Sequence, residues 1–304
     1  MKFTSDEIRD LCTPTGGRFA VVDTAAAYHW CRRLALGHYE NFPVGSVLIP
    51  TVQRPHFFAV YAFSRVADDI ADEPGFSQEE RALLLQQYET LLRHHSTAGS
   101  HPIFRSLDCT IRDCQIPLLP LLQLLEAFRR DVYFTRPVTM DDVYDYCTYS
   151  ANPVGEMVLR IAGCYSKSNH ELSNAICTGL QMVNFWQDTS TDLLRGRNYY
   201  PITMSKDVSF DIKDLGNEKF CTNFPSILVS VLEATDHQFT KGMSLINVLP
   251  TLRLRSEIAL TVVCGRYIAS QVRQLGTDII QIRPALSVNS LPSVLFGTLK
   301  LLMW

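Results

Sequence analysis

Two groups of acidic residues carry the strongest chemical signal in this 304-residue sequence. The first group, Asp68 and Asp72, follows Tyr61 and Arg65 in an apolar stretch. On a helix these carboxylates lie one turn apart on one face, where they could ligate a hard cation such as Mg²⁺. Arg65 precedes Asp68 by almost one turn, within reach of the carboxylates or of a phosphate. The alternative is a solvated acidic helix end before Pro74, but the apolar flank indicates a largely buried helix, where acids are costly.

The second group lies in another apolar stretch. Asn184, Asp188 and Asp192 recur every four residues, and Gln181 falls near the same helical face. Two arginines that could bind anions or cap the helix follow, Arg195 and Arg197. A capped amphipathic helix is the alternative interpretation of this pattern. Its oxygen-bearing side chains again suit a hard cation.

Taken together, the two groups predict a magnesium clamp for a diphosphate or triphosphate. Metal ions that bridge acids and a diphosphate neutralise the leaving group, so C–O heterolysis can occur in a dry apolar pocket. The sequence has no P-loop, no G-x-G-x-x-G and no kinase-like set of motifs, which disfavours a nucleotide-binding protein.

The elements that would position these residues are helices. Hydrophobic residues with a period of 3.6 predict an all-α fold, and no convincing run of alternating strand residues is present. The predicted helices cover about 20–40, 55–73, 78–96, 118–131, 140–164, 170–193, 223–245 and 251–275. Pro153 should break or kink one of them, and 202–222 should be mainly a loop. We expect a single domain over 1–304, with 1–18 a poorly defined N-terminus and 285–304 a C-terminal apolar tail or helix.

Composition narrows the classes of partner and compartment. The formal net charge of −3 gives no basic excess for nucleic acid. The nine cysteines are scattered without a C-x-x-C pair, and the first residues lack the apolar core of a signal peptide. We therefore expect a cytoplasmic protein. The apolar segment 291–304 is too short to span a membrane. It could be a terminal helix that closes the core, or a peripheral anchor at the inner membrane with Lys300 and Trp304 at headgroup level.

Three motifs together resemble the squalene/phytoene synthase family: Tyr61–Glu73, Tyr146–Glu156 and Asn184–Pro201. The similarity runs from about His38 to Arg283 and implies an isoprenoid synthase helical bundle around a central apolar cavity. It also implies that Tyr61 is catalytic and that Mg²⁺ is held by Asp68, Asp72, Asn184, Asp188 and Asp192. The residues that it assigns to the diphosphate or the walls of the site are Arg65, His38, Gln181, Arg195, Arg197, Tyr267 and Arg283.

Within this family the sequence is most similar to the bacterial hydroxysqualene synthase branch of the hopanoid pathway. Members that condense two prenyl diphosphates usually have a basic, serine-rich segment where this chain has Glu40 and Asn41, and arginine where it has Gln187. These departures fit a substrate with one diphosphate, presqualene diphosphate, which would ionise, rearrange and be captured by water to give hydroxysqualene. The sequence shows no nicotinamide-binding fingerprint, which agrees with water rather than hydride as the terminating nucleophile. The alternatives are condensation of two farnesyl diphosphates, a catalytically silent assembly factor of the squalene and hopanoid pathway, and a prenyl-lipid binding protein.

Overall fold

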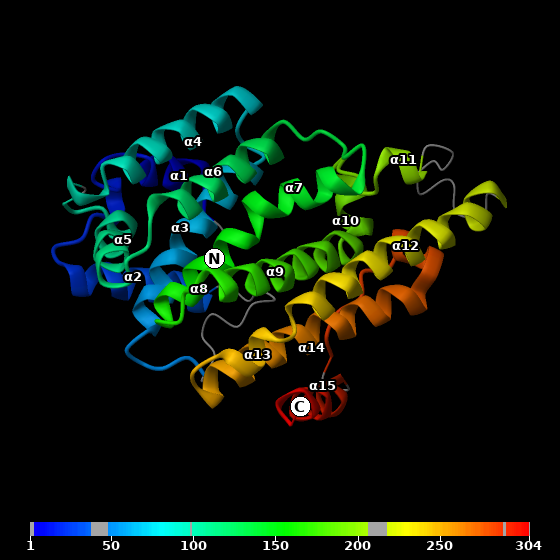
Figure 1. The fold of residues 1–304 in the computed structure, drawn as a ribbon. Coiled ribbons are helices and arrows are strands. Elements are labelled where there is room, and N and C mark those ends of the chain that lie inside the picture. Colours follow the sequence, from blue (N-terminus) through cyan, green and yellow to red (C-terminus); the bar gives the residue numbers. More distant parts are fainter. Residues whose placement is uncertain (1–2, 38–47, 98, 206–217, 288–289, 304) are drawn as a thin grey trace. The chain divides into compact units, whose positions relative to one another are not determined.

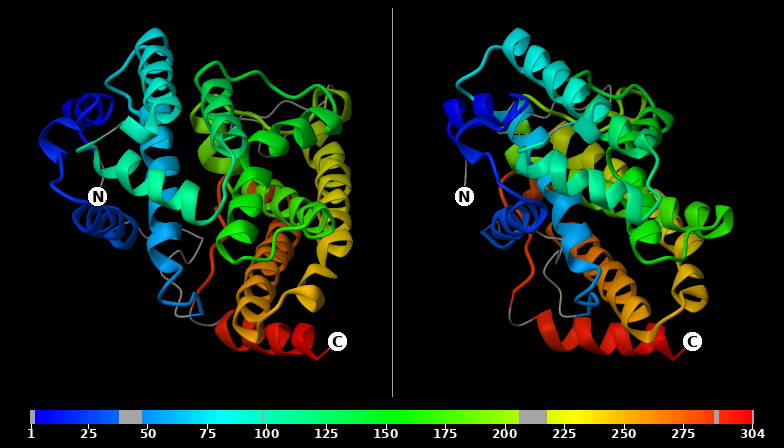
Figure 2. Two further views of the ribbon diagram at one scale, coloured as in Figure 1. Left: turned by 60° about the vertical axis from the view of Figure 1, so that its left-hand side comes forward. Right: turned by 90° about the vertical axis from the view of Figure 1, so that its left-hand side faces the viewer.

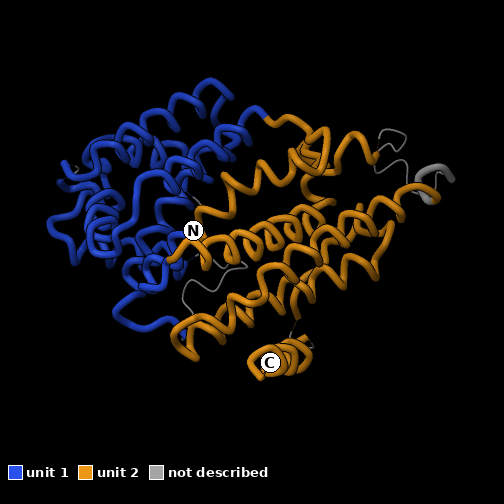
Figure 3. Tube along the Cα trace, viewed as in Figure 1, with its two compact units in different colours: residues 1–133, 156–165 blue, residues 134–155, 166–304 orange. Residues whose placement is uncertain are grey.

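A computed structural model describes residues 3–37, 48–97, 99–205, 218–287 and 290–303, with only the backbone for residues 218–221. Every regular element in these ranges is helical, which confirms the predicted all-α class (Figure 1). The chain divides into two compact units (Figure 3): Met1–Tyr133 with Glu156–Tyr165, and Phe134–Gly155 with Ser166–Trp304. The single domain and the central apolar cavity stay predictions.

The first unit is built around the helix that carries the first acidic motif, α3 (Arg54–Asp72). The helices packed against α3 are α1 (Ser5–Leu11), α2 (Thr24–Gly37), α4 (Gln78–Arg93), α5 (Pro102–Asp113) and α6 (Leu118–Val132). Two short 3-10 turns complete the series, η1 (Gly17–Phe19) and η2 (His95–Thr97). Phe63 on α3 is fully buried and stacks on Tyr88 of α4 at 5.3 Å between ring centroids. The helices packed around α3 therefore fix the orientation of the acidic motif at its C-terminal end.

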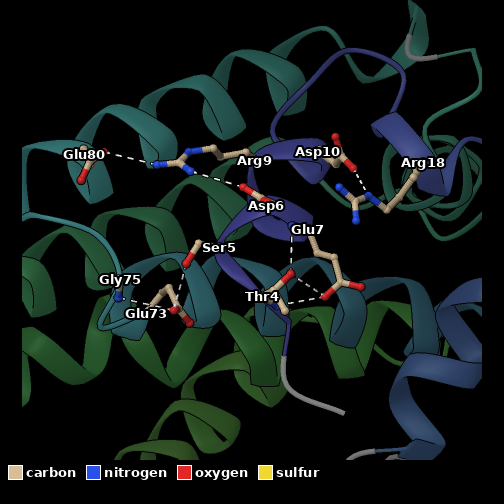
Figure 4. A network of polar contacts seen from close by, with 10 residues as sticks. All are labelled: Thr4, Ser5, Asp6, Glu7, Arg9, Asp10, Arg18, Glu73, Gly75 and Glu80. Carbon is tan, nitrogen blue, oxygen red and sulfur yellow. Dashed lines mark hydrogen bonds and ion pairs between the residues drawn. The ribbon is translucent and has the colours of Figure 1, made fainter.

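A polar network ties α1 to the C-terminal end of α3 (Figure 4). Ser5 donates a hydrogen bond to the carboxylate of Glu73, the residue that follows α3, over 3.2 Å. One turn further along α1, Arg9 reaches Glu80 of α4 at 3.4 Å. Helix α1 itself begins with a capping box between Thr4 and Glu7, which satisfies backbone donors of its first turn. The N-terminal segment thus positions the end of the acidic helix, although the sequence predicted no helix there.

The second unit has α9 (Lys167–Gln187) at its centre. The helices that pack against α9 are α7 (Met140–Ser150), α10 (Thr189–Leu194), α12 (Glu218–Gly242), α13 (Leu245–Val248) and α14 (Leu252–Leu275). The remaining elements of this unit are α11 (Ile202–Ser205), η4 (Gly276–Ile280) and α15 (Leu291–Leu302). Close packing requires Gly242, because a Cβ there would lie 2.7 Å from the backbone oxygen of Leu172. The second acidic motif thus begins on the central helix of its unit, as the first motif lies on α3.

Two predicted helices are each divided in the structure. The expected helix 140–164 is interrupted at Ala151 and continues as α8 (Asn152–Ile161), which confirms the expected break at Pro153. The expected helix 170–193 is divided at Asp188 into α9 and α10, which corrects the prediction of one continuous helix. The sequence also missed α5, which begins at Pro102 directly after the capping residue His101.

The C-terminal segment forms α15, which lies against α14 and contacts α13 (Figure 2). Gly297 makes this contact close, since a Cβ there would lie 3.0 Å from a methyl group of Val263 on α14. Among the helices of the described ranges, none is both long and apolar enough to cross a membrane.

Candidate active site

The first motif occupies the last turns of α3. Asp72 is the final residue of the helix, and Asp68 lies one turn before it. The carboxyl end of a helix carries partial negative charge, so carboxylates placed there are electrostatically unfavourable. A bound cation would offset this cost, which makes the end of α3 a suitable place for a metal.

Four predicted site residues share one face of α3. Tyr61, Arg65, Asp68 and Asp72 are separated by four, three and four residues, the spacing that aligns side chains along a helix. Asp72 is exposed, and the side chain of Asp68 is 42% exposed. The expectation of buried acids was therefore wrong for this pair, because both carboxylates lie at the accessible end of an otherwise apolar helix.

The buried acid of this motif is Asp69, which the sequence did not single out. Its side chain is 5% exposed and pairs with Arg65 through two contacts, Nη2–Oδ1 at 2.5 Å and Nε–Oδ2 at 3.3 Å. Arg65 also lies 3.5 Å from Asp68. A bidentate pair of this kind fixes the plane of the guanidinium. Arg65 is thus held by Asp69 beside the accessible acid, and the four-residue spacing of Arg65 and Asp69 was the signal available in the sequence.

The second motif keeps its spacing across the break between α9 and α10. Asp188 has φ −92° and ψ 9°, which interrupts the helix. The amide of Asp188 nevertheless donates to the Asn184 carbonyl, and that of Asp192 donates to the Asp188 carbonyl, each over 2.8 Å. The predicted oxygen ligands Asn184, Asp188 and Asp192 therefore remain about one turn apart, as the sequence indicated. Asn184 is exposed, whereas Asp188 and Asp192 are half-buried.

Aromatic residues hold the second motif in place. Tyr199 stacks on Phe185 with ring centroids 3.9 Å apart, and Tyr200 packs against Trp186 at 5.0 Å. The Tyr200 hydroxyl shares a 2.9 Å hydrogen bond with Thr189, next to Asp188. Burial raises the pKa of Tyr200 above its ordinary value, which keeps the hydroxyl protonated. The sequence included these tyrosines in the motif but assigned them no role.

Two contacts attach the segment after η4 to the second motif. Arg283 Nε lies 2.5 Å from Asp188 Oδ1, and the side-chain amide of Gln187 donates to the Pro284 carbonyl over 2.8 Å. Gln187 is buried and turned towards the protein. Arg283, which the resemblance assigns to the diphosphate site, is therefore beside a predicted metal ligand.

The remaining predicted residues are dispersed. Gln181 lies on α9 about two turns before Asp188, and Tyr267 lies on α14; both are half-buried. Arg195 and Arg197 follow α10, where their backbone amides donate to the Asp192 carbonyl over 3.0 and 2.8 Å. His38, together with Glu40 and Asn41, lies outside the described residues.

The model of the squalene/phytoene synthase family matches residues 36–290. The chain belongs to this family. It is therefore an isoprenoid synthase, and the match contains both acidic motifs and Arg283.

Individual relatives agree with the family match. Hydroxysqualene synthase of Sinorhizobium fredii is 32% identical over 79% of this chain and 81% of its own length. The enzyme of the same name from Zymomonas mobilis is 36% identical over 59% of this chain, a stretch that spans 61% of that relative. Among solved structures, squalene synthase HpnC from Alicyclobacillus acidocaldarius is 35% identical, with a TM-score of 0.76 over 87% of this chain and 99% of that one.

Magnesium fits the oxygen donors that these motifs present. Members of the squalene/phytoene synthase family process prenyl diphosphates and typically depend on a divalent metal. Within the described part of the chain, no three His, Cys, Asp or Glu side chains form a ready metal cluster. Mg²⁺ usually binds through one or two carboxylates together with waters and substrate phosphates, so it needs no closed protein cage. The accessible acids of α3 and of the α9–α10 junction suit that mode of binding.

Proposed function

We propose that this protein converts presqualene diphosphate to hydroxysqualene and releases diphosphate. The observation that carries the proposal is the set of accessible carboxylates at the ends of two central helices, in a chain 32% identical to a hydroxysqualene synthase over most of its length. In this reaction the C–O bond to the diphosphate breaks, and the diphosphate keeps the electron pair. The cation rearranges, a water oxygen adds to it, and one proton is released.

Each group of residues has a part in this proposal. Asp68 and Asp72, and separately Asn184, Asp188 and Asp192, would hold Mg²⁺, which when bound neutralises the charge of the leaving diphosphate. Arg65 and Arg283 would bind diphosphate oxygens as charge-assisted donors. Tyr61 would line the site on the same face of α3 as the acids. Stacked aromatic rings such as Phe185 and Tyr199 would exclude bulk water from the carbocation.

The side chain of Gln187 favours a substrate with one diphosphate. It is buried and bonded to Pro284 rather than directed at the acids, so it adds no anion-binding group to the second motif. The main alternative is condensation of two farnesyl diphosphates, and it is kept because a relative 35% identical to this chain is named a squalene synthase. If the proposal holds, an enzyme that joins two farnesyl diphosphates must supply the substrate.

Supplying the candidate substrates separately tests the proposal. With Mg²⁺ and presqualene diphosphate, the purified protein should yield hydroxysqualene and diphosphate, measured by mass spectrometry and a diphosphate assay. Asp68→Asn should lower the rate by at least about a hundredfold, because it removes a metal-binding charge. Asp141→Asn, an exposed acid in the first turn of α7, is the matched control and should retain activity.

The other outcomes of this assay identify the alternatives. Consumption of farnesyl diphosphate without turnover of presqualene diphosphate would establish a condensing synthase. A folded protein inactive on both substrates would be an assembly factor, or a prenyl-lipid binder if it still bound the diphosphate in a Mg²⁺-dependent way.

We also propose that α15 contacts an anionic lipid surface. Leu295, Phe296 and Leu299 on this helix are 58%, 71% and 59% exposed. The neighbouring segments α13 and α14 expose Val248 and Leu252. Residues 241–256 and 290–303 together contain four cationic side chains and no acidic one. Exposed apolar side chains combined with positive charge favour binding at an anionic membrane interface. Trp304, part of the sequence prediction for this anchor, lies outside the described residues.

A further inference from the structure

The end of α9 makes two adjacent contacts with one segment of the chain. Gln187 binds the Pro284 carbonyl, and the next residue, Asp188, binds the Arg283 side chain. The segment begins at η4, where Ile279 and Ile280 are fully buried, and the amide of Ile282 donates to the Asp278 carbonyl over 2.8 Å. We call residues 281–287 the strap. Two consecutive residues of α9–α10 thus face two consecutive residues of the strap.

The two contacts differ in strength. The Arg283 and Asp188 side chains are 38% and 31% exposed, and ion pairs that water can reach stabilise a structure only slightly. Gln187 is 4% exposed and Pro284 is buried, so loss of their hydrogen bond would leave buried polar groups without partners, which is costly. The Gln187 bond is therefore the stronger of the two attachments of the strap.

Pro284 adds a second constraint on Arg283. A proline restricts the backbone of the preceding residue to extended conformations. The Gln187 bond fixes the position of Pro284, while the proline ring limits the conformations of the Arg283 backbone. Together they direct a long, flexible guanidinium side chain towards a single carboxylate with less loss of entropy on binding.

We infer that Gln187 is a positioning residue: through Pro284 it holds Arg283 beside Asp188, where the guanidinium neutralises the carboxylate in the free protein and would face a diphosphate that Mg²⁺ holds at that carboxylate. This inference rests on the proposed function only in taking a metal-bound diphosphate as the ligand. Gln187 does not touch the diphosphate. Its effect on binding passes entirely through Arg283, so the two residues should be coupled energetically.

Binding of inorganic pyrophosphate at a fixed Mg²⁺ concentration, measured by calorimetry, tests this coupling without an isoprenoid or turnover. Gln187→Met removes the donor while keeping a side chain of similar length, and it should weaken pyrophosphate binding about tenfold, close to the effect of Arg283→Met. The double variant should bind about as weakly as either single one. Gln281→Met, the same change at an exposed position of the strap, should bind like the wild type.

Two further measurements guard against a merely structural effect. Circular dichroism and thermal unfolding report whether each variant folds. If Gln187→Met does not fold, Pro284→Gly, which keeps the carbonyl but frees the Arg283 backbone, should weaken pyrophosphate binding severalfold.

The results that would overturn the inference are equally definite. A Gln187→Met protein with a lower Tm but unchanged pyrophosphate affinity would show a structural role only. Additive losses in the double variant would show that Gln187 does not act through Arg283. Because product identity is assayed separately, a wrong substrate assignment would leave these binding results intact.

Discussion

At the scale of single residues, neighbouring acids in the first motif have different environments. Asp69 is buried and paired with Arg65, whereas Asp68, one position earlier, is accessible. A step of one residue on a helix turns a side chain by about 100°, which is enough to move it from the core to the surface. The sequence identified the spacing of Asp68 and Asp72 correctly. It could not show that Arg65 would pair mainly with Asp69, because that pairing depends on which face of α3 is buried.

His101 is a titratable residue whose role is structural. Its Nδ1 accepts hydrogen bonds from the amides of Ile103 and Phe104, which caps α5, and its Nε2 lies 3.0 Å from the Leu11 carbonyl. Nδ1 must be unprotonated to accept these bonds, so the neutral ring is required. Burial lowers the pKa of His101 to about 4.

This shift predicts a loss of stability in acid. The unfolded chain takes up a proton at His101 near pH 6.5, whereas the folded chain does so only near pH 4. As pH falls from 6.5 to 4, the unfolded state binds more protons, and the free energy of unfolding should drop by on the order of 3 kcal/mol from this residue.

Urea unfolding of two variants checks the assignment to His101. His101→Asn keeps a capping oxygen but cannot titrate, so its free energy of unfolding should fall less steeply over this pH range. His237→Asn, a change at an exposed histidine of α12, should follow the wild-type slope. Parallel slopes for His101→Asn and the wild type would contradict the account.

At the scale of elements, the long helices with clear periodicity were predictable. The expected helices 55–73, 118–131 and 251–275 agree with α3, α6 and α14 to within one residue at each end. Helix α5 was missed although its apolar residues recur at helical spacing, because Pro102 also fits a helix boundary and histidine is an unusual capping residue. The break at Asp188 was not predictable from periodicity, because the apolar pattern continues through it; in the structure the flanking residues Phe185 and Thr189 contact Tyr199 and Tyr200, which lie further along the chain.

Helix α15 begins at Leu291, directly after the part of the chain that matches the family. Its exposed apolar side chains make a prediction for lipid binding. The wild type should sediment with vesicles that contain phosphatidylglycerol. A double variant, Phe296→Glu with Leu299→Glu, should bind at least tenfold less (about 1.4 kcal/mol or more), because it replaces apolar contacts with negative charge.

A second double variant provides the matched control for α15. Leu83 and Leu119 are 54% and 62% exposed on α4 and α6, and their replacement by glutamate should leave sedimentation unchanged. Equal binding of the α15 variant and the wild type would exclude α15 as the contact, and failure of the wild type to bind at all would remove the proposal.

At the scale of the whole molecule, the sequence already placed the chain in its family, and the family match confirms that placement. Each unit contains one central helix, and the carboxylates at the end of each of these helices suit a hard cation such as Mg²⁺. The residues alone do not distinguish the substrate, because two closely related reactions in one family use the same kinds of residue. Identification of the product distinguishes the two reactions.

Incubation of the protein with presqualene diphosphate and Mg²⁺ in ¹⁸O-labelled water tests the central claim most directly. If water captures the cation after diphosphate leaves, mass spectrometry should find hydroxysqualene with one ¹⁸O atom in its hydroxyl group. Hydroxysqualene without the label, or squalene formed only when a reduced nicotinamide is added, would contradict the claim.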